Sequence, residues 1–325
     1  MSGMRIVLCY PVEERHIRQI EAAARPLAAD VEVVDAGQER IAEEILAADI
    51  YCGHAKVPMP WPQVVAAGRL RWIQSSAAGI DHCLVPEIAS SEIPVTSASG
   101  VLADQVAEHA MALITAQLRS LPVFFRAQAA HEFIRRPTRD LTDSTVGIVG
   151  LGGVGRRLAQ VLEPFRVRTL ATDAYPIDKP ACVDELWPAD RLDDLLQVSD
   201  VVVLALPLNG QTRGLIDRTR LLKMKPDALL VNVARGAIIV ERDLIEVLRS
   251  GHLLGAAVDV TENEPLAPDS PLWDFSNVII TPHVGGQSAR RIDNMTNFFC
   301  ENLARYHRGE PLLNMVDKQL GFPRR

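Results

Sequence analysis

The chain has 325 residues, of which 48% are hydrophobic and 23% charged, so it is long enough for two domains with separate cores. Its net charge is −7 without a long run of either sign, which argues against a nucleic-acid-binding or anionic-membrane surface. No stretch reaches the roughly 18 consecutive apolar residues of a membrane span. The five cysteines are scattered without a CxxC pair, which is typical of reduced thiols in a cytoplasmic protein.

Strand and helix signals alternate along the first part of the chain. Two stretches of helical character, residues 12–29 and 38–48, separate some of the strand signals. This alternation is typical of a parallel sheet with helices packed on it. The predicted strands are residues 5–10, 31–35, 50–52, 70–75 and 93–97.

The second part of the chain shows the same alternation of strand and helix signals more clearly. Its apolar runs are mostly continuous, as expected of strands that are buried on both faces. A crossover helix over residues 243–249 is closed by Gly251. The predicted strands are residues 145–150, 168–173, 201–206, 228–234, 255–260 and 278–281.

Two long helix candidates lie at the ends of the second part, at residues 102–118 and 289–306. They would carry the chain from a first domain into a second and back again. We therefore expect one domain over residues 1–101 and 292–325, a second over residues 102–291, and a cleft between them.

A glycine-rich turn follows the first strand of the second part. Gly150, Gly152 and Gly155 form the pattern GxGxxG, and a helix is predicted over residues 154–162. Alone the pattern also fits a structural turn, but this strand–turn–helix context is typical of a dinucleotide fingerprint. Gly150 permits the tight turn, Gly152 lets the backbone approach a pyrophosphate, and Gly155 lets helix and strand pack closely.

The acidic residue Asp173 ends the next predicted strand and indicates the choice of cofactor. A carboxylate at this place accepts hydrogen bonds from the adenosine ribose and repels a 2′-phosphate. No arginine follows it, because the next residues are Ala174, Tyr175 and Pro176. The sequence therefore predicts NAD rather than NADP.

A second motif, Tyr175 and Lys179, has the YxxxK spacing of short-chain dehydrogenases. That pair works only when both side chains lie on one helical face. Pro176 lies inside the motif and disfavours such a helix, so we interpret the spacing as coincidental.

Polar segments follow three of the predicted strands, at residues 232–236, 259–265 and 281–286. Together with the glycine turn and residues 106–109 (Val-Ala-Glu-His), they resemble the D-isomer-specific 2-hydroxyacid dehydrogenase family over essentially the whole chain. The resemblance implies a two-domain α/β protein. Its first domain would be a flavodoxin-like substrate-binding domain and its second a doubly wound Rossmann NAD-binding domain.

The resemblance also implies roles for individual residues. Arg235 would hold the substrate carboxylate, His283 would be the acid/base, and Glu264 would be the partner of His283. Asp259 would bind the nicotinamide carboxamide. The loop over residues 76–81 would bind the substrate carboxylate through Ala77, Ala78 and Gly79. Further cofactor contacts would come from Gly153, Val154, Leu206, Pro207, Val233, Ala234, His283 and Gly285.

The three proposed catalytic residues suit carbonyl reduction. Negative charge develops on the carbonyl oxygen during hydride transfer, so a positioned proton donor such as His283 is needed, and a carboxylate beside it favours its protonated form. The guanidinium fork of Arg235 matches a planar carboxylate. Taken singly, Arg235 also fits a surface charge, Glu264 a solvated loop residue, and His283 a helix N-terminal residue.

Some features lie outside this scheme. His109 falls within a predicted helix and is interpreted as structural or orienting, and no cluster of residues has metal-site spacing. Thr261 stands where the family commonly has an aromatic residue, Ser288 replaces a frequent threonine, and residues 130–134 lack a frequent tryptophan. These departures leave substrate choice and subunit contacts open.

The sequence therefore predicts an NAD-dependent oxidoreductase that transfers hydride between NADH and a small 2-oxo acid to give a D-2-hydroxy acid. A formate-dehydrogenase-like enzyme and an NAD-sensing corepressor of the same fold are the alternatives. The pairing of His283 with Glu264 argues against the formate-dehydrogenase-like enzyme. Glyoxylate, hydroxypyruvate, pyruvate, longer 2-oxo acids and 3-phosphoglycerate share the required carboxylate–carbonyl unit. Lys56 and Arg71 make no obvious phosphate-binding cluster, so small unphosphorylated acids are favoured.

The resemblance further suggests a homodimer in which residues 121–141 of the second domain pack on the partner. Four apolar side chains of this stretch would be poorly buried in a monomer. They are Phe124, Phe125, Phe133 and Ile134.

Overall fold

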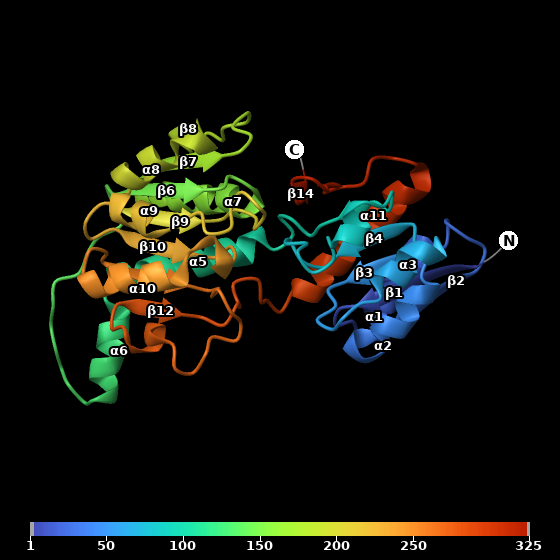
Figure 1. The fold of residues 1–325 in the computed structure, drawn as a ribbon, viewed down its shortest axis with the longest axis horizontal. Coiled ribbons are helices and arrows are strands. Elements are labelled where there is room, and N and C mark those ends of the chain that lie inside the picture. The colour runs from blue at the N-terminus through green and yellow to red at the C-terminus, as the bar shows by residue number, and fades with distance from the viewer. Residues whose placement is uncertain (1–2, 324–325) are drawn as a thin grey trace. The chain divides into compact units, whose positions relative to one another are not determined.

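The computed structural model describes residues 3–323, and the chain divides into two compact units. The first unit comprises Met1–Leu102 and Ser288–Arg325, and the second comprises Ala103–Gln287. The boundaries expected at residues 101 and 292 thus lie one and four residues from those observed. Figure 1 shows that each unit is built around its own twisted sheet flanked by helices.

The first unit contains a five-stranded sheet in the order β2-β1-β3-β4-β5, and every neighbouring pair is parallel. This order is that of the flavodoxin-like doubly wound fold, as expected. All five strands were predicted from the sequence, with ends that differ by up to two residues. They are β1 (Met4–Cys9), β2 (Val31–Asp35), β3 (Ile50–Gly53), β4 (Trp72–Ser75) and β5 (Val95–Thr96).

Helices cover both faces of this sheet because successive strand residues point to opposite sides. Ile6 and Leu8 of β1 pack with Phe299 in one core, whereas Val7 and Cys9 pack with other residues in a second core. The helices of the first core are α1 (Glu14–Ala24) and α11 (Arg291–Arg308). Those of the second core are α2 (Gly37–Glu44), α3 (Trp61–Ala67) and α4 (Pro86–Ala89). A short hairpin, β13 (Val316–Asp317) and β14 (Phe322–Pro323), completes the unit.

The second unit contains a seven-stranded parallel sheet in the order β12-β11-β10-β9-β6-β7-β8. Counted within the unit, this is the 3-2-1-4-5-6 order of a dinucleotide-binding Rossmann sheet with one further strand, as expected. The glycine turn follows β6, where the strand order reverses. The strands are β6 (Thr145–Val149), β7 (Arg168–Asp173), β8 (Glu185–Pro188), β9 (Val201–Leu204), β10 (Leu229–Asn232), β11 (Gly255–Val258) and β12 (Val278–Ile280).

Two cores also lie on the two faces of the second sheet. In β9, Val201 and Val203 face one core, while Val202 and Leu204 face the other. Each fully buried side chain of this kind contributes about 1.5–3 kcal/mol to folding. The first core includes α5 (Ala103–Leu118) and α7 (Gly153–Leu162), and the second includes α8 (Leu192–Val198), α9 (Arg218–Lys223) and α10 (Glu241–Ser250). Short 3-10 turns lie at Ile45–Ala47, Glu163–Phe165, Ala189–Arg191, Gly236–Ile238 and Pro271–Asp274.

The segment between α5 and β6 begins with α6 (Leu121–Ala129) and continues as irregular chain over residues 132–140. Figure 1 shows this segment at the margin of the unit, away from the strands. Phe125, Phe133 and Ile134 are exposed, and Phe133 keeps 95% of its surface accessible. Phe124, by contrast, is half-buried, so one of the four apolar side chains expected to be exposed is partly covered.

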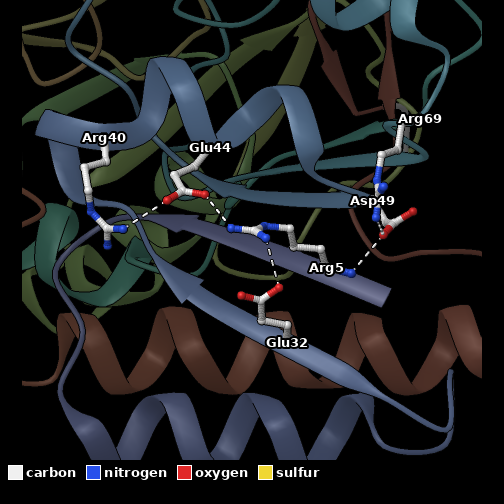
Figure 2. A network of polar contacts seen from close by, with 6 residues as sticks. All are labelled: Arg5, Glu32, Arg40, Glu44, Asp49 and Arg69. Carbon is white, nitrogen blue, oxygen red and sulfur yellow. Dashed lines mark hydrogen bonds and ion pairs between the residues drawn. The ribbon is translucent and has the colours of Figure 1, made fainter. Parts of the chain in front are cut away.

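A network of ion pairs lies at the amino ends of the first unit's strands (Figure 2). Arg5 of β1 contacts Glu32 of β2 at 3.0 Å and Glu44 of α2 at 2.5 Å. The carboxylate of Asp49, just before β3, accepts the Arg5 backbone N–H and contacts Arg69 at 3.1 Å. The network therefore ties the starts of neighbouring strands to each other and to a helix. Across residues 3–323, no helix is long and apolar enough to cross a membrane.

Candidate active site

Three loops of the second unit carry the proposed catalytic residues. Arg235 follows β10, Glu264 follows β11, and His283 follows β12, and these strands are neighbours in the sheet. The loops after β10 and β11 touch through their backbones, because a Cβ placed on Gly236 would lie 1.9 Å from the backbone of Thr261. Only glycine allows this approach, so the loops are held side by side at the carboxyl edge of the sheet.

The side chains of His283 and Glu264 are in direct contact. His283 Nδ1 lies 2.8 Å from Glu264 Oε2, and the Thr261 N–H is 3.4 Å from the other carboxylate oxygen. Nδ1 therefore carries a proton and donates it to the carboxylate, which leaves Nε2 to exchange a proton with a substrate. The two side chains are 47% and 41% exposed, so a ligand can reach them.

The backbone of His283 has φ of +55°, which is uncommon for a residue other than glycine. Its N–H donates to the carbonyl oxygen of Asp259 at 2.7 Å, and this bond holds the turn. A conformation of this kind costs on the order of 1 kcal/mol or more and persists only where the surroundings fix it. The imidazole is thus presented by a loop with little freedom to relax.

The loop of Arg235 is fixed by a buried amide. Asn232 has no exposed surface; its Oδ1 accepts the Ala234 N–H at 3.0 Å and its Nδ2 donates to the Arg235 carbonyl at 3.0 Å. Arg235 is half-buried, and its Nη1 donates to the Ala234 carbonyl at 2.8 Å. Sequence reasoning did not assign a role to Asn232. A polar residue at the end of an otherwise apolar strand could have indicated one.

Asp259 fastens the loop that carries His283. Its carboxylate is almost fully buried and accepts the Thr281 hydroxyl at 2.6 Å and the backbone N–H groups of Val284 and Gly285 at 2.9 and 2.8 Å. A Cβ on Gly285 would lie 2.9 Å from Asp259 Oδ2, so the loop passes close over the carboxylate. The expected contact with a carboxamide would use the acceptor capacity that remains on this oxygen.

One further acidic pair lies beside this loop. Glu241, at the start of α10, and Glu262 accept each other's backbone N–H groups, both at 3.3 Å. Burial raises the pKa of the Glu241 carboxyl, and the charge of Glu262 adds to this effect. The reciprocal bonds join α10 to the loop between β11 and Glu264.

The glycine turn has the geometry that a pyrophosphate requires. Gly150 has φ of +94°, and a Cβ there would lie 2.7 Å from the carbonyl of Ala205. A Cβ on Gly155 would lie 2.2 Å from the Gly150 carbonyl, so strand and helix pack closely. A Cβ on Gly152 would meet nothing within 4 Å, so the space at the amino end of α7 is open. Open space beside unpaired helix N–H groups suits an anion, and these residues fit a dinucleotide.

The other expected cofactor residues lie along the same edge of the sheet. Some begin α7, and others follow the carboxyl ends of β9 and β10, which flank the point where the strand order reverses. In chain order they are Gly153, Val154, Leu206, Pro207, Val233 and Ala234.

Asp173 is the last residue of β7. Its Oδ2 accepts the Leu151 N–H and its Oδ1 accepts the Tyr175 N–H, both at 2.8 Å. Arg156 of α7 also reaches this region, with Nε 3.2 Å from the Leu151 carbonyl and Nη1 3.0 Å from Asp178 Oδ2. Sequence reasoning considered only arginines that follow Asp173, and so it missed one that arrives from the helix after the glycine turn.

The YxxxK spacing of Tyr175 and Lys179 forms no helix. Both residues lie in irregular chain after β7, and Lys179 Nζ donates to the Val183 carbonyl at 2.6 Å. The interpretation of this motif as coincidental is confirmed.

In the first unit, the loop after β4 carries the proposed carboxylate-binding residues. The Ser75 hydroxyl accepts the Ala77 N–H at 3.0 Å and donates to the Ala77 carbonyl at 2.9 Å, which shapes the turn. Ala77 and Gly79 are half-buried, and Ala78 is exposed. Within residues 3–323, the N–H groups of Ala78 and Gly79 have no protein acceptor, so they remain for a ligand or solvent. These are suitable donors for an anion.

Two histidines that sequence reasoning did not single out lie beside this loop. The rings of His54 and His82 are stacked, with centroids 3.9 Å apart, and His82 Nε2 is 3.5 Å from the Ser75 hydroxyl. His54 follows β3, and His82 follows the 76–81 loop. Their proximity depends on the neighbouring positions of β3 and β4, which a reading of the chain in linear order does not show.

The described residues contain no group of three or more histidine, cysteine, aspartate or glutamate side chains that could hold a metal ion. Burial raises the pKa of the Cys9 thiol to about 11 and that of Cys83 to about 12. A nucleophilic thiolate at either position is therefore disfavoured at neutral pH.

Comparisons with known proteins agree with this site. The family model described as "D-isomer specific 2-hydroxyacid dehydrogenase, NAD binding domain" matches residues 111–285, more than half of the chain. The glyoxylate reductase of Thermofilum pendens is 35% identical over 270 residues, which cover 78% of this chain and 77% of the relative.

Two solved structures share the fold over nearly their whole length. A D-isomer-specific 2-hydroxyacid dehydrogenase from Xanthobacter autotrophicus Py2, in complex with NADPH and MES, has a TM-score of 0.82 and 27% identity, covering 98% of this chain and 100% of that one. An NADPH-dependent glyoxylate/hydroxypyruvate reductase from Sinorhizobium meliloti, in complex with NADP and sulfate, has the same TM-score and identity, covering 98% and 99%. This chain is therefore an oxidoreductase with an NAD(P)-binding domain, and it belongs to the D-isomer-specific 2-hydroxyacid dehydrogenase family.

Proposed function

We propose that this protein is an NAD-dependent D-2-hydroxyacid dehydrogenase that acts on a small, unphosphorylated 2-oxo acid. The observation that carries the proposal is the contact between His283 and Glu264 at the carboxyl edge of the sheet. Arg235 lies on the loop after the neighbouring strand β10, at the same edge. When bound, the nicotinamide supplies the hydride for reduction or accepts it for oxidation.

His283 moves the proton that this reaction requires. In reduction, the carbonyl carbon gains the hydride and the carbonyl oxygen takes the proton from His283 Nε2, so a hydroxyl forms and the imidazole becomes neutral. Glu264 accepts the Nδ1 hydrogen bond throughout, which fixes the orientation of the ring and leaves Nε2 directed to the substrate. In oxidation the neutral ring takes the hydroxyl proton.

The substrate carboxylate is recognised by groups that are fixed before it binds. The Arg235 guanidinium would offer two parallel N–H donors, and Asn232 holds the backbone that carries it. We also assign a carboxylate-binding role to the N–H groups of Ala78 and Gly79. Ala77 shapes this loop through its bonds with Ser75.

The preference for NAD rests on Asp173. Its carboxylate ends β7 and would lie against the adenosine ribose, where it accepts hydroxyl hydrogen bonds and repels a 2′-phosphate. Arg156 lies near this residue, and it already pairs with Asp178. Because the two solved relatives named above contain NADPH or NADP, this preference is the most informative part of the proposal to test.

The assay is a panel of 2-oxo acids with NADH and with NADPH. We expect turnover of small acids such as glyoxylate, the substrate named for the Thermofilum pendens relative. NADH should be favoured by about 100-fold in kcat/KM, which corresponds to about 3 kcal/mol. Asp173→Ala should narrow this gap mainly by weakening NADH, and equal kcat/KM values for the two cofactors in the wild type would refute the assignment.

The same assay separates the alternatives. A corepressor-like protein would bind NADH without turning over any acid of the panel, and a formate-dehydrogenase-like enzyme would reduce NAD with formate. The His283–Glu264 pair argues against the formate-dehydrogenase-like enzyme, because formate oxidation has no carbonyl oxygen that needs a proton. The pair does not distinguish an enzyme from a corepressor, and the turnover measurement decides between them.

We also propose a cytoplasmic homodimer that buries α6 and the chain after it. The exposed aromatic side chains of Phe125 and Phe133 support this interface. Light scattering at micromolar concentration should give twice the monomer mass. Phe133→Asp should shift the protein towards the monomer, and a wild-type monomer would exclude the dimer.

A further inference from the structure

His109 is a histidine outside the His283–Glu264 pair that contacts the same loop. It lies on α5, and its Nε2 is 2.9 Å from the Thr281 hydroxyl and 3.2 Å from Asp259 Oδ1. Its side chain is 20% exposed, whereas that of Asp259 is 4% exposed. A helix on one face of the sheet thereby reaches the loop that carries His283.

The donors in this cluster can be assigned from the contacts alone. The Asp259 carboxylate accepts backbone N–H groups from Val284 and Gly285, so it is the acceptor for the Thr281 hydroxyl as well. A hydroxyl has one proton, and Thr281 gives it to Asp259 at 2.6 Å. Nε2 of His109 must then carry a proton and donate it to Thr281 Oγ1, with Asp259 Oδ1 as a second acceptor.

The two carboxylate oxygens of Asp259 accept different numbers of hydrogen bonds. Among the residues that the structure describes, Oδ1 is contacted by Thr281, Val284 and, at a longer distance, His109, while Oδ2 accepts only the Gly285 N–H. Each carboxylate oxygen has two lone pairs, so one acceptor position remains, and it is on Oδ2. A carboxylate held by several donors on one oxygen cannot rotate freely to exchange the two.

We propose that His109 is a positioning residue for the reaction. Through Thr281 and Asp259 Oδ1, it holds the Asp259 carboxylate in the orientation that leaves Oδ2 ready for the amide of a nicotinamide ring. The same bonds hold residues 281–285, which present His283. The inference rests on the proposed dehydrogenase function. It adds a residue, His109, whose described contacts include neither His283 nor Arg235.

The test compares His109→Leu with His109→Gln. Leucine removes the donor, so NADH should bind about five- to tenfold more weakly and kcat should fall about tenfold, a loss typical of one charge-assisted hydrogen bond. Glutamine restores an N–H donor and should recover both values to within about threefold. The pH at which the reductive rate declines should stay unchanged in both, because His283 remains the proton donor.

Thr281→Val gives an independent readout, since it removes the hydroxyl with little change of shape. Its effect should have the same direction, and the double variant His109→Leu/Thr281→Val should be within about twofold of the worse single variant, because both act through one carboxylate. His252→Gln is the matched control. His252 contacts only the Met224 carbonyl among its side-chain contacts, at 3.0 Å, so its replacement should leave kcat and NADH affinity unchanged.

The outcomes separate this inference from the proposed function. Absence of turnover in the wild type with every 2-oxo acid would defeat the function, while the NADH dissociation constants would still decide the role of His109. Wild-type NADH affinity in His109→Leu would overturn the inference. Failure of His109→Gln to recover either value, or additive effects in the double variant, would also overturn it.

Discussion

Charged side chains cluster at the amino ends of the first unit's strands and at the carboxyl ends of the second unit's strands. The two clusters differ in their exposure and in their number of partners. At the amino ends of the first unit's strands, Arg5, Glu44 and Asp49 are half-buried or buried and bond to several partners each (Figure 2). At the carboxyl ends of the second unit's strands, the His283–Glu264 pair is nearly half exposed. The first network joins strands together, whereas the second leaves Nε2 of its histidine available.

The difference follows from how parallel sheets are used. Ligands bind at the carboxyl ends of the strands, so charges at the amino ends are free to serve stability alone. Exposed ion pairs contribute only about 0–1 kcal/mol, and the stability of the His283–Glu264 pair is therefore not a reason for its presence. Exposure, together with the strained backbone of His283, supports our proposal that the pair is functional.

The largest effect expected from this comparison is in the rate of catalysis. His283→Ala should lower kcat by about 10²–10⁴, the usual contribution of a positioned acid. Its melting temperature should be close to that of the wild type, because the side chain is exposed and its backbone bond to Asp259 remains. Steady-state kinetics and calorimetry measure the two quantities. A kcat within threefold of the wild type would remove His283 from the mechanism.

Arg235→Lys should have the next largest effect. Lysine keeps a positive charge but cannot donate two parallel hydrogen bonds to one carboxylate. KM for the oxo acid should therefore rise about 10- to 100-fold, and kcat should also fall. NADH affinity should change little, since the substitution leaves the glycine turn intact. Unaltered KM in Arg235→Ala would show that the carboxylate is bound elsewhere.

The amino-end network predicts the opposite pattern. Asp49→Asn removes the charge that Arg69 contacts in a nearly buried site, and it should lower the free energy of unfolding by about 1.5–3 kcal/mol. Glu32→Gln is the matched control, because Glu32 is 60% exposed in the same network and should cost less than about 1 kcal/mol. Both variants should keep wild-type kcat at temperatures where they are folded. Urea unfolding and assays of the same preparations check this.

The sequence predicted most of the fold because buried parallel strands are continuous apolar runs. Twelve strands belong to the two large sheets, and only β8 (Glu185–Pro188) among them was missed. It is an edge strand whose residues are half-buried or exposed, so its run is mixed in composition. The short helix α9 was also missed, although Asp217, whose side chain accepts the Arg220 N–H, was a usable start signal.

The candidate site was predictable to the extent that residues stand at strand ends. Arg235, Glu264 and His283 could be placed on loops at one edge of the sheet, but the 2.8 Å contact within the pair depends on the shapes of two loops. The contacts of His109 and Arg156 depend on which helix packs over which strand. That information is tertiary, and no local pattern in the chain carries it.

The smallest effect expected concerns the tuning of His283 by Glu264. Reduction needs the protonated imidazole and oxidation the neutral one, so the reductive rate should fall as pH rises and the oxidative rate should rise. Glu264→Gln keeps the shape of the partner but removes its negative charge, which disfavours the protonated ring. The decline of the reductive rate should then occur at lower pH.

The size of this shift follows from the exposure of the pair. An exposed pair is worth only about 0.2–1 kcal/mol, so the displacement of the reductive pH profile should be small. The oxidative limb should move in the same direction by the same amount, because both report one imidazole. Superimposable profiles for wild type and Glu264→Gln would mean that the carboxylate only orients the ring, and a shift to higher pH would contradict the dyad. A large shift to lower pH would contradict the small effect expected of an exposed pair, because it requires bound substrate and cofactor to exclude water and so to strengthen the interaction between the two charges.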